Sequence, residues 1–509
     1  PHVRFDEGEV APATTPRRGS LLYNRRDFVS GSLAFAGASF FIGGCATRNG
    51  VRRIPANAKV NVAIIGCGLI AKTTNVPGFL QDPRCRVTTV CDVVEIAPDY
   101  FYGGRGSNFG AEGFAKADGS YRRDICGWRV IRDMVNRHYG DKACRVVTDW
   151  RDVIDDATID AVCICTPDHW HAIMSIAAMK AGKHVFCQKP MSLSVAEGQE
   201  MVRVAKETGV TFQVGNQGAT NPAYRLSEEI VLNGYAGKVK SATICIPACD
   251  HWAGHGRCAA RAPLPGYFSE EGWNMWQGPA LHWENNAYIP SIHDPTCWRF
   301  NNRYGGGMIP DFGAHEFDEL NRGLGTQFTG PVAVENMESD YATGADRDVF
   351  SWPGEFKFDF VFASGLRCHV RKIDRANGWP RQTIFHCEKG DVGSYDGKGK
   401  VPDCLKNFKE SDLTDKDIKL YRPNEGHDGS KFHESDFLDG VIEGRTSVAS
   451  TCEMGHRTIS MAHIANICAR MQLRSLKWDP AAERFVGAYA DEANRFLKVR
   501  YHNGWELGA

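Results

Sequence analysis

Apolar and polar positions follow two different patterns along the chain, and the first clear one covers residues 60–92. Residues 60–65 and 87–91 are short apolar runs, and the segment between them is compatible with a helix. Apolar runs of this length are typical of buried strands in a parallel sheet. The pattern therefore predicts a strand, a helix and a second, parallel strand.

The alternation of strands and helices continues to about residue 209. Its predicted elements are strands at residues 160–165 and 184–187 and helices at residues 172–180 and 195–208. Gly182 follows the first helix as a C-terminal cap, and Ser194 with Glu197 forms a capping box before the second. Polar residues collect at the strand ends, where the ligands of a doubly wound sheet bind.

From about residue 211 the period of the pattern changes. Residues 357–362 and 366–371 alternate on either side of a Ser364-Gly365 turn, and residues 383–387 alternate again. This indicates a largely antiparallel sheet, with long helices following at residues 433–443 and 453–471.

The turn after the first strand has the glycine spacing of a dinucleotide site. Gly66 permits a tight turn, Gly68 lets the backbone approach a pyrophosphate at the helix start, and Ala71 is small enough for helix packing. Asp92 follows about 20 residues later, as expected for a carboxylate that accepts from a ribose 2′-hydroxyl and repels a 2′-phosphate. The alternative is the same turn without a ligand. The strand before it, the helix after it and the acid together favour a nucleotide, and NAD over NADP.

Composition narrows the class of protein. The 509 residues exceed one ordinary domain, and 42% hydrophobic with 24% charged residues is typical of a globular protein with a large core. A formal net charge of -1 gives no reason to expect a nucleic-acid partner. The 18 cysteines are scattered without a CxxC pair or zinc spacing, so those inside apolar runs are interpreted as small buried hydrophobic residues.

Residues 1–50 resemble an export signal and a tether. Arg25 and Arg26 precede an uncharged, mildly apolar run at residues 29–42, which resembles a twin-arginine signal and is too short for a comfortable membrane span. Cys45 resembles the lipidated cysteine of a lipobox, the alternative being an incidental cysteine in a cleavage region. The expectation is a protein exported already folded to the periplasm, with Cys45 as a candidate lipid anchor.

Four motifs in order give a family resemblance: GCGLIA, TPDHWHA, QKP and DFGAHEFD. This combination is similar to the Gfo/Idh/MocA oxidoreductases and covers about residues 59–478. The resemblance implies an N-terminal Rossmann dinucleotide-binding domain, an α/β domain with an open, mainly antiparallel sheet, and oxidation or reduction of sugars, inositols or polyols with NAD or NADP. The predicted segments are the signal and tether at 1–50, the Rossmann domain at 51–190, the substrate-binding domain at 191–478 and a tail at 479–509.

The resemblance assigns catalysis to Lys189, Asp311 and His315. Oxidising an alcohol requires a base and a neighbouring donor at one oxygen. Asp311 and His315 share a face if a helix covers residues 310–318, so Asp311 can fix the tautomer of His315. Lys189 ends a strand, where burial and the nicotinamide charge are expected to lower its pKa. The alternatives are an N-capping aspartate with a surface histidine, and a solvated Lys-Pro loop.

Further contacts follow from the same motifs. The residues expected to bind the nucleotide are Gly66, Gly68, Leu69, Ile70, Ala71, Asp92, Thr166, Pro167, His171, Gln188, Lys189 and Gln217. His169 and His171 are interpreted as cofactor or substrate contacts, not metal ligands, because no third ligand is indicated. Gln188 stands where the family commonly has Glu, and an amide cannot stabilise the Lys189 cation as a carboxylate would.

Residues 250–304 are rich in tryptophan, interleaved with His, Arg and Asn. Flat indoles suit the C–H faces of a sugar ring, although at least half of them are expected simply to pack the second domain. The residues expected to bind substrate are Lys189, Trp298, Arg299, Asp311 and His315.

The resulting hypothesis is an oxidoreductase acting on a secondary hydroxyl of a sugar, sugar derivative or polyol with tightly bound nucleotide, because free NAD is expected to be scarce outside the cytoplasm. One alternative is a redox-neutral glycoside hydrolase or lyase that oxidises, eliminates, adds water and reduces, as some relatives of the family do. Another is a non-catalytic sugar-binding protein. No metal is expected, and the family resemblance implies a dimer or tetramer.

Overall fold

The computed structural model describes Ile54, Pro55, Leu264 and residues 58–97, 125–247, 266–281, 298–341, 351–395, 398–423 and 433–507. Several predictions lie outside the described residues. They are the export signal with Cys45, and Trp252 and Trp283 of the tryptophan-rich segment at residues 250–304.

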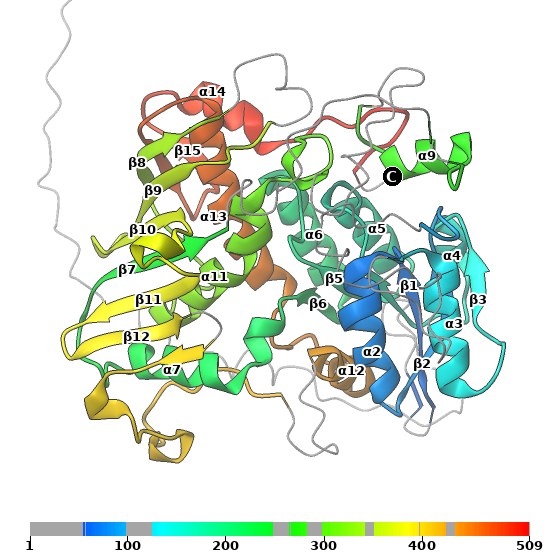
Figure 1. Cartoon of the computed structure of the whole chain (residues 1–509), viewed down its shortest axis with the longest axis horizontal. Helices are drawn as coiled ribbons and strands as arrows, with labels where there is room; N and C mark the ends of the chain where they lie inside the picture. The colour runs from blue at the N-terminus through cyan, green and yellow to red at the C-terminus, as the bar shows by residue number, and fades with distance from the viewer. Residues whose placement is uncertain are drawn as a thin grey trace, which may run out of the picture. The chain divides into compact units, whose positions relative to one another are not determined.

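The first domain is a six-stranded parallel sheet, drawn in blue to teal in Figure 1. Its strands are β1 (Val60–Ile65), β2 (Cys85–Cys91), β3 (Arg145–Val147), β4 (Ala161–Ile164), β5 (His184–Gln188) and β6 (Phe212–Gly215). They are arranged in the order β3-β2-β1-β4-β5-β6, which confirms the predicted Rossmann domain. The order reverses between β1 and β4, and ligands of such sheets bind at the carboxyl ends of the strands beside that point.

The helices of this domain are α2 (Val76–Gln81) after the π-helical turn η1 (Ala71–Asn75), α3 (Trp128–Tyr139), α4 (Arg151–Asp155), α5 (Asp168–Lys180) and α6 (Val195–Thr208). Of the two helices with predicted bounds in this domain, α6 has the predicted bounds, whereas α5 begins at Asp168, four residues before the predicted start. Ser194 and Glu197 form the predicted capping box of α6, and Gly209 ends that helix at φ 69°.

The predicted domain boundary at residue 190 is too early. Strand β6 pairs in parallel with β5, so α6 and β6 complete the first sheet and the domain extends to about residue 215. With only four residues, β6 is too short for its pattern to be separated from the second domain in the sequence.

The second domain contains an open nine-stranded sheet in the order β13-β12-β11-β7-β10-β9-β8-β14-β15. The strands are β7 (Val239–Ile246), β8 (Ala333–Ser339), β9 (Phe356–Val361), β10 (Arg367–Lys372), β11 (Gln382–Cys387), β12 (Gly390–Tyr395), β13 (Lys398–Lys400), β14 (Leu476–Asp479) and β15 (Arg484–Val486). Apart from the parallel pair β7 and β10, the neighbours run antiparallel, as predicted. The helices that follow the first sheet in sequence are α7 (Pro222–Leu232), α9 (Glu270–Gln277), α11 (Met308–Leu324), α12 (His433–Glu443), α13 (Cys452–Arg470) and α14 (Ala490–Asn494). Of these, α12 packs against α2, β1 and β6 of the first domain.

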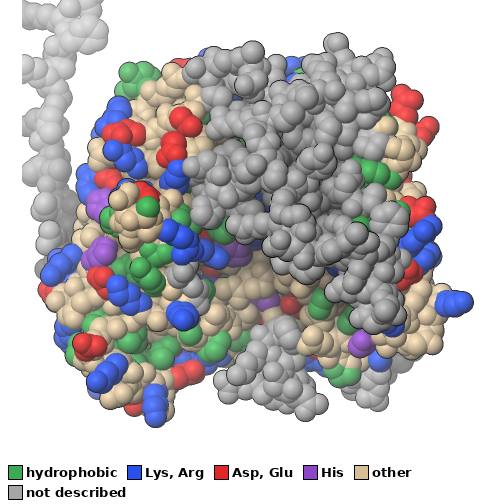
Figure 2. All heavy atoms as spheres, viewed as in Figure 1, with side chains coloured by type: hydrophobic (Ala, Val, Ile, Leu, Met, Phe, Trp, Pro, Cys, Tyr) green, Lys and Arg blue, Asp and Glu red, His purple; other side chains and the backbone are tan. Residues whose placement is uncertain are grey.

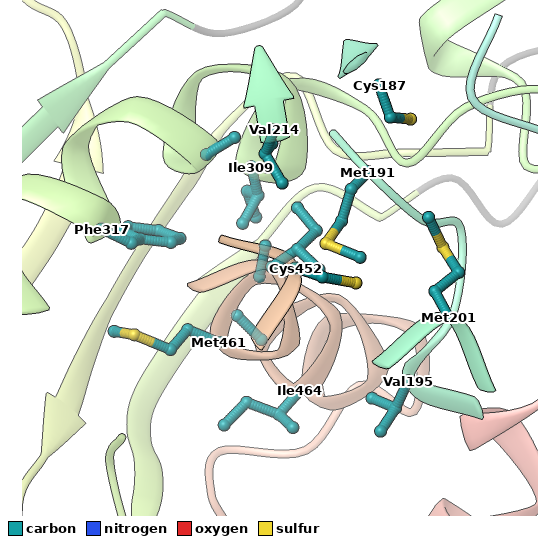
Figure 3. Close-up of a cluster of buried hydrophobic side chains, with 14 of the residues drawn as sticks. Cys187, Met191, Val195, Met201, Val214, Ile309, Phe317, Cys452, Met461 and Ile464 are labelled. Carbon is teal, nitrogen blue, oxygen red and sulfur yellow. The ribbon is translucent and has the colours of Figure 1, made fainter. Parts of the chain in front are cut away.

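Helix α13 joins the two domains through a shared apolar core, shown in Figure 3. It packs against α6 and β6 of the first domain and against α11 and β8 of the second. Met191, Met201 and Val214 from the first domain meet Ile309 and Phe317 of α11 around this helix. This core holds α11, which carries two of the predicted catalytic residues, in a fixed position against the carboxyl end of the Rossmann sheet.

The tail predicted at residues 479–509 first adds β15 to the second sheet and then returns to the first domain. The Tyr501 hydroxyl donates to Glu197 Oε1 at 2.5 Å. The Trp505 ring centroid lies 4.9 Å from that of Trp170 and 6.0 Å from that of Trp150. The tail therefore connects the second sheet to helices of the first domain.

The charges on the surface and the state of the cysteines agree with what the composition predicts. On the face drawn in Figure 2, basic and acidic side chains are interspersed over the coloured surface. No disulfide joins any described cysteine, and all of them except Cys404 are buried. Within the described ranges, no helix combines the length and the apolar character needed to span a bilayer.

Candidate active site

The predicted glycine turn lines a cavity at the carboxyl ends of β1, β2 and β4. The lining includes Gly66, Cys67, Gly68, Asp92, Thr166 and Pro167. Gly66 adopts φ 89°, and a Cβ there would lie 2.7 Å from the backbone carbon of Cys165. A glycine is thus required for β1 and β4 to approach each other at this turn. Ala71 is fully buried in the helix–sheet core, as its predicted packing role requires.

Asp92 is held by backbone donors in this cavity. Its carboxylate oxygens accept from Cys67 N at 2.6 Å and from Val94 N at 2.9 Å. Burial raises the pKa of Asp92, and these N–H groups act against that rise. A partly buried carboxylate stabilised by neutral donors suits a ribose diol and disfavours a phosphate, which fits the NAD prediction. Thr166 Oγ1 is also buried, with no hydrogen-bond partner among the described residues, and is available to a ligand.

Helix α9 covers the cavity from the second domain. Met275 and Trp276 line it, and the Trp276 carbonyl lies 3.0 Å from His169 Nε2 and 3.1 Å from Trp170 Nε1. Because a carbonyl only accepts, His169 carries a proton on Nε2. The TPDHWHA segment therefore anchors α9 over the cavity.

His171 supports the site from behind, which corrects its prediction as a nucleotide contact. It is 1% exposed, with Nδ1 2.7 Å from Pro190 O and Nε2 2.8 Å from Thr166 O. Burial lowers the pKa of His171 to about 4, so the ring is neutral. A neutral imidazole has one N–H, so the ring donates to one of these two carbonyls and only packs against the other, and both nitrogens are enclosed by the loops after β4 and β5.

Lys189 and Asp311 form the centre of the site. Lys189 Nζ donates to Asp311 Oδ1 at 2.8 Å and to Asp311 O at 2.9 Å, and Arg299 Nε lies 3.1 Å from the same Oδ1. Burial alone would raise the pKa of Asp311, but the Arg299 and Lys189 charges outweigh it and hold that pKa below its ordinary range. The Asp311 carboxylate is thus charged and keeps two cations at the end of β5.

His315 lies on α11 one turn after Asp311, as predicted, and is partly exposed. Its Nδ1 is 2.7 Å from Asn216 Oδ1, so Asn216 contacts the ring where Asp311 was expected. The prediction that Asp311 fixes the tautomer is wrong, because the Asp311 carboxylate is turned to Lys189 and Arg299. Burial, followed by the Lys189 charge, lowers the pKa of His315 well below its ordinary value, so the imidazole is neutral near pH 7.

Asp168 adds a second carboxyl group that the sequence did not reveal. It is the first residue of α5 and 3% exposed, and it accepts a hydrogen bond from the Gly306 backbone. Burial and the Asp311 charge raise the pKa of Asp168 to about 8, against the opposing charges of Arg299 and Lys189. Two neighbouring carboxyls with pKa values moved in opposite directions are typical of acid–base sites.

Gln188 is directed into the first domain, away from the Lys189 ammonium. Its Nε2 donates to Asn75 Oδ1 at 2.9 Å, and Asn75 Nδ2 donates to Glu434 Oε1 at 2.8 Å. The carboxylate beside Lys189 is that of Asp311, so the Glu-to-Gln departure leaves the cation with a partner. Gln217 interacts with Glu434 at the same place. The nucleotide contacts of Gln188, Gln217, Leu69 and Ile70 stay predictions.

Trp298 and Arg299 have different roles from one another. Trp298 is 6% exposed in an apolar cluster with Phe300 and Tyr304, so it packs the domain. Arg299 Cζ lies 4.4 Å from the Trp298 ring centroid, and its guanidinium reaches Asp311. Trp298 thus positions Arg299, and only Arg299 of this pair is brought into the charged cluster.

Two residues of the site were missed by sequence reasoning. Asn216 directly follows β6, and Asp168 follows β4, so both obey the rule that polar residues at strand ends converge on the site. The early domain boundary hid the first, and the second lies in the TPDHWHA motif, in which no role was predicted for Asp168. Within the described ranges, no three His, Cys, Asp or Glu side chains gather where they would hold a metal ion.

The comparisons with known proteins agree with this geometry. A family model for the Gfo/Idh/MocA proteins, described as an oxidoreductase family with an NAD-binding Rossmann fold, matches residues 133–216. That segment runs from α3 to Asn216 and includes Asp168 and Lys189.

Two proteins with similar sequences and one with a similar structure are examples of the matches. Levoglucosan dehydrogenase of Pseudarthrobacter phenanthrenivorans is 36% identical over 94 residues, which are 18% of this chain and 24% of that protein. 2,7-Anhydro-N-acetylneuraminate hydratase of Mediterraneibacter gnavus is 34% identical over 109 residues, which are 21% of this chain and 28% of that one. This chain thus spans about a quarter of the length of these relatives. The structure of GenD2 from gentamicin A biosynthesis in complex with NAD shares the fold, with a TM-score of 0.52 and 16% identity over 84% of this chain and 99% of that one.

Proposed function

We propose that this chain, whose residues 133–216 match the family model of the Gfo/Idh/MocA oxidoreductases, is an NAD-dependent enzyme acting on a secondary hydroxyl of a sugar, sugar derivative or polyol. The observation that carries the proposal is the cluster of Lys189, Asp311 and His315 at the end of β5. It lies beside the cavity of the glycine turn, because His171 links the loops after β4 and β5.

The residues of the cavity fit a dinucleotide. Gly66 and Gly68 provide the close backbone approach, Asp92 provides an acceptor for ribose hydroxyls, and Thr166 Oγ1 is unpaired. NAD bound there supplies the hydride acceptor or donor for the substrate carbon.

The chain's own residues handle the substrate oxygen. Lys189, held by Asp311, presents an ammonium that binds a hydroxyl and stabilises the developing alkoxide. His315, neutral and partly exposed, accepts the hydroxyl proton in the oxidative direction and returns it in the reductive one. Helix α9, anchored by His169 and Trp170, keeps water from the cavity.

A redox-neutral lyase or hydrolase is the second candidate, and two observations favour it. One relative is named a hydratase, and the site holds Asp168 as an extra carboxyl with a pKa of about 8. Eliminating and adding a group next to an oxidised carbon needs a proton donor for the leaving oxygen in addition to the base that oxidation uses. Asp168 has the protonation state for that role at neutral pH.

The deciding experiment uses protein purified without added nucleotide and a panel of free sugars and aryl glycosides. Nicotinamide absorbance and aglycone release are followed together. A stoichiometric burst of NADH that continues only with an acceptor sugar supports the oxidoreductase, and continuous aglycone release without net NADH supports the redox-neutral enzyme. Sugar binding without either signal would leave a non-catalytic binding protein.

The proposal also covers the cellular compartment and the oligomeric state of the protein. Arg25, Arg26 and the run at residues 29–42 support export by the twin-arginine route, with the nucleotide loaded before export. The mass of the mature N-terminus tests this, since a lipidated Cys45 gives a defined mass increase. The oligomeric state, expected to be a dimer or tetramer, is measured by light scattering.

A further inference from the structure

We propose that Asn216, held in one orientation by Asp318, is a positioning residue that fixes His315 in the tautomer with its proton on Nδ1 and leaves Nε2 as the proton acceptor of the site. The part of this inference that concerns turnover rests on the proposed function, whereas the tautomer itself does not.

Three short contacts define the arrangement. Asn216 Oδ1 lies 2.7 Å from His315 Nδ1, and Asn216 Nδ2 donates to Asp318 Oδ2 at 2.7 Å and to Ala314 O at 3.3 Å. Asn216 and Asp318 are 2% and 1% exposed. The amide is therefore enclosed between the end of β6 and one face of α11.

The direction of these hydrogen bonds follows from their chemistry. A carboxylate only accepts, as does a backbone carbonyl, so the Asn216 NH₂ group must face Asp318 and Ala314. Its oxygen then faces His315, and an amide oxygen only accepts. His315 Nδ1 must therefore be the donor, which places the ring proton on Nδ1.

Asp318 is the fixed end of this series of hydrogen bonds. Its carboxylate accepts from Arg322 Nη1, from Asn216, and from Thr458 Oγ1 at 3.4 Å. Burial raises the pKa of Asp318, and Arg322 and Thr458 oppose that rise. Arg322 is itself held by Glu228 through Nε at 2.8 Å and Nη2 at 2.6 Å. The orientation of one amide is thus set by a buried ion-pair network between α7 and α11.

The second ring nitrogen of His315, Nε2, is the atom that can act on a substrate. The charged or titratable groups that act on His315 are Lys189 after β5, Asp311 on α11, Arg381 before β11 and His433 on α12. Burial and then the cations keep the imidazole neutral, and the described part of the chain offers Nε2 no hydrogen-bond partner. A neutral ring with its proton on Nδ1 can accept a proton at Nε2 only. His315 Nε2 is therefore ready to accept the proton of the substrate hydroxyl.

The effect on the pKa of His315 explains why residue 216 carries an amide and not a carboxylate. A carboxylate at Nδ1 would stabilise the imidazolium and raise the pKa of His315, as in pairs of Asp and His. A neutral oxygen fixes the tautomer without stabilising the cation, so His315 stays unprotonated close to Lys189.

The experiment is ¹⁵N NMR of histidine-labelled, nucleotide-loaded protein, with His315 assigned by its loss in His315→Gln. The wild type is expected to show Nδ1 protonated and Nε2 unprotonated at pH 7.5. Asn216→Leu should give a mixed-tautomer or Nε2-protonated ring, and Asn407→Leu, at an exposed asparagine, should leave the signal unchanged. A His315 signal with the same Nδ1 protonation in Asn216→Leu overturns the proposal.

The double variant Asn216→Asp/Asp318→Asn keeps the shape of both side chains and still sets an amide donor against a carboxylate, whereas Asn216→Asp alone would set two buried carboxylates 2.7 Å apart. The double variant should move the acidic limb of the pH profile of turnover upward by about one pH unit or more, because the new carboxylate favours the imidazolium. An unmoved limb contradicts the inference. If the wild type shows no turnover, the proposed function fails, and the NMR titration of His315 still decides the role of Asn216.

Discussion

Lys189 Nζ donates to the Asp311 carboxylate at 2.8 Å although the two residues are 122 positions apart in the sequence. Lys189 belongs to the Rossmann domain and Asp311 to a helix of the second domain. The shared core around α13 holds these two parts together, so the cluster of Lys189 and Asp311 forms only when both domains are packed. The chemistry of the site is thus coupled to the interface of the domains.

Removing the Lys189 cation should abolish most of the turnover. Lys189→Met is expected to lower kcat by about 10²- to 10⁴-fold, since it removes a donor to the substrate oxygen and leaves Asp311 with one cation fewer. Steady-state kinetics on the substrate found in the panel measures the loss. The matched control is Lys206→Met, which removes an exposed ion pair with Glu453 and should leave kcat unchanged. Equal turnover in both variants would contradict the catalytic role of Lys189.

The glycine turn gives a test that needs no substrate. Gly66→Ala should reduce the nucleotide that copurifies with the protein by about tenfold or more, which is roughly 1.4 kcal/mol of binding free energy. The added Cβ would lie 2.7 Å from the Cys165 backbone at φ 89°, so the turn must shift. Gly140→Ala is the control, because Gly140 also has positive φ, at 69°, but its Cβ would meet open space. Equal nucleotide content in the two variants would mean that the cavity at β1 does not hold the nucleotide.

Much of the architecture could be predicted because local patterns specified it. The apolar runs at β1, β4 and β5, the capping box at Ser194 and Glu197, and the Ser364-Gly365 turn between β9 and β10 depend on neighbours in sequence. The four-residue period from Asp311 to His315 likewise predicted a shared helix face.

What the sequence could not specify are partners chosen by tertiary packing. Asn216 became the partner of His315 because β6 ends against α11, and no local signal encodes that approach. The pKa of Asp168 is raised by burial and then by the charge of Asp311, which arrives from another domain. Trp298 and Arg299 are neighbours in sequence, yet packing buries one and turns the other to Asp311.

The returning tail should contribute measurably to stability. Trp505→Ala removes ring contacts with Trp150 and Trp170 and is expected to lower the free energy of unfolding by about 1–3 kcal/mol. Urea unfolding followed by fluorescence and by circular dichroism measures the change. Phe328→Ala, at a ring that is 60% exposed, should change the unfolding free energy by less than about 0.5 kcal/mol. A loss at Trp505 no larger than that at Phe328 would show that the tail is not anchored there.

The pKa of Asp168 predicts how stability depends on pH. An unfolded aspartate loses its proton near pH 4, whereas Asp168 in the folded protein keeps it up to about pH 8. Between these values the folded state holds one proton more than the unfolded state, so the unfolding free energy falls as the pH rises. Glu197, Glu228 and Glu434, each with its pKa raised by burial to about 7, act in the same direction.

Asp168→Asn isolates this contribution, because the amide keeps the shape and an acceptor for the Gly306 N–H but does not titrate. The fall in unfolding free energy between pH 5 and pH 8 should become smaller by about 1–4 kcal/mol relative to the wild type. Urea titrations at a series of pH values measure the slope. Asp149→Asn is the control: a hydrogen bond from Arg151 lowers the pKa of Asp149, so its titration falls below pH 4 and should leave this slope unchanged. An unchanged slope in Asp168→Asn would mean that Asp168 is ionised at pH 7, and its role as a proton donor in the redox-neutral reaction would then be excluded.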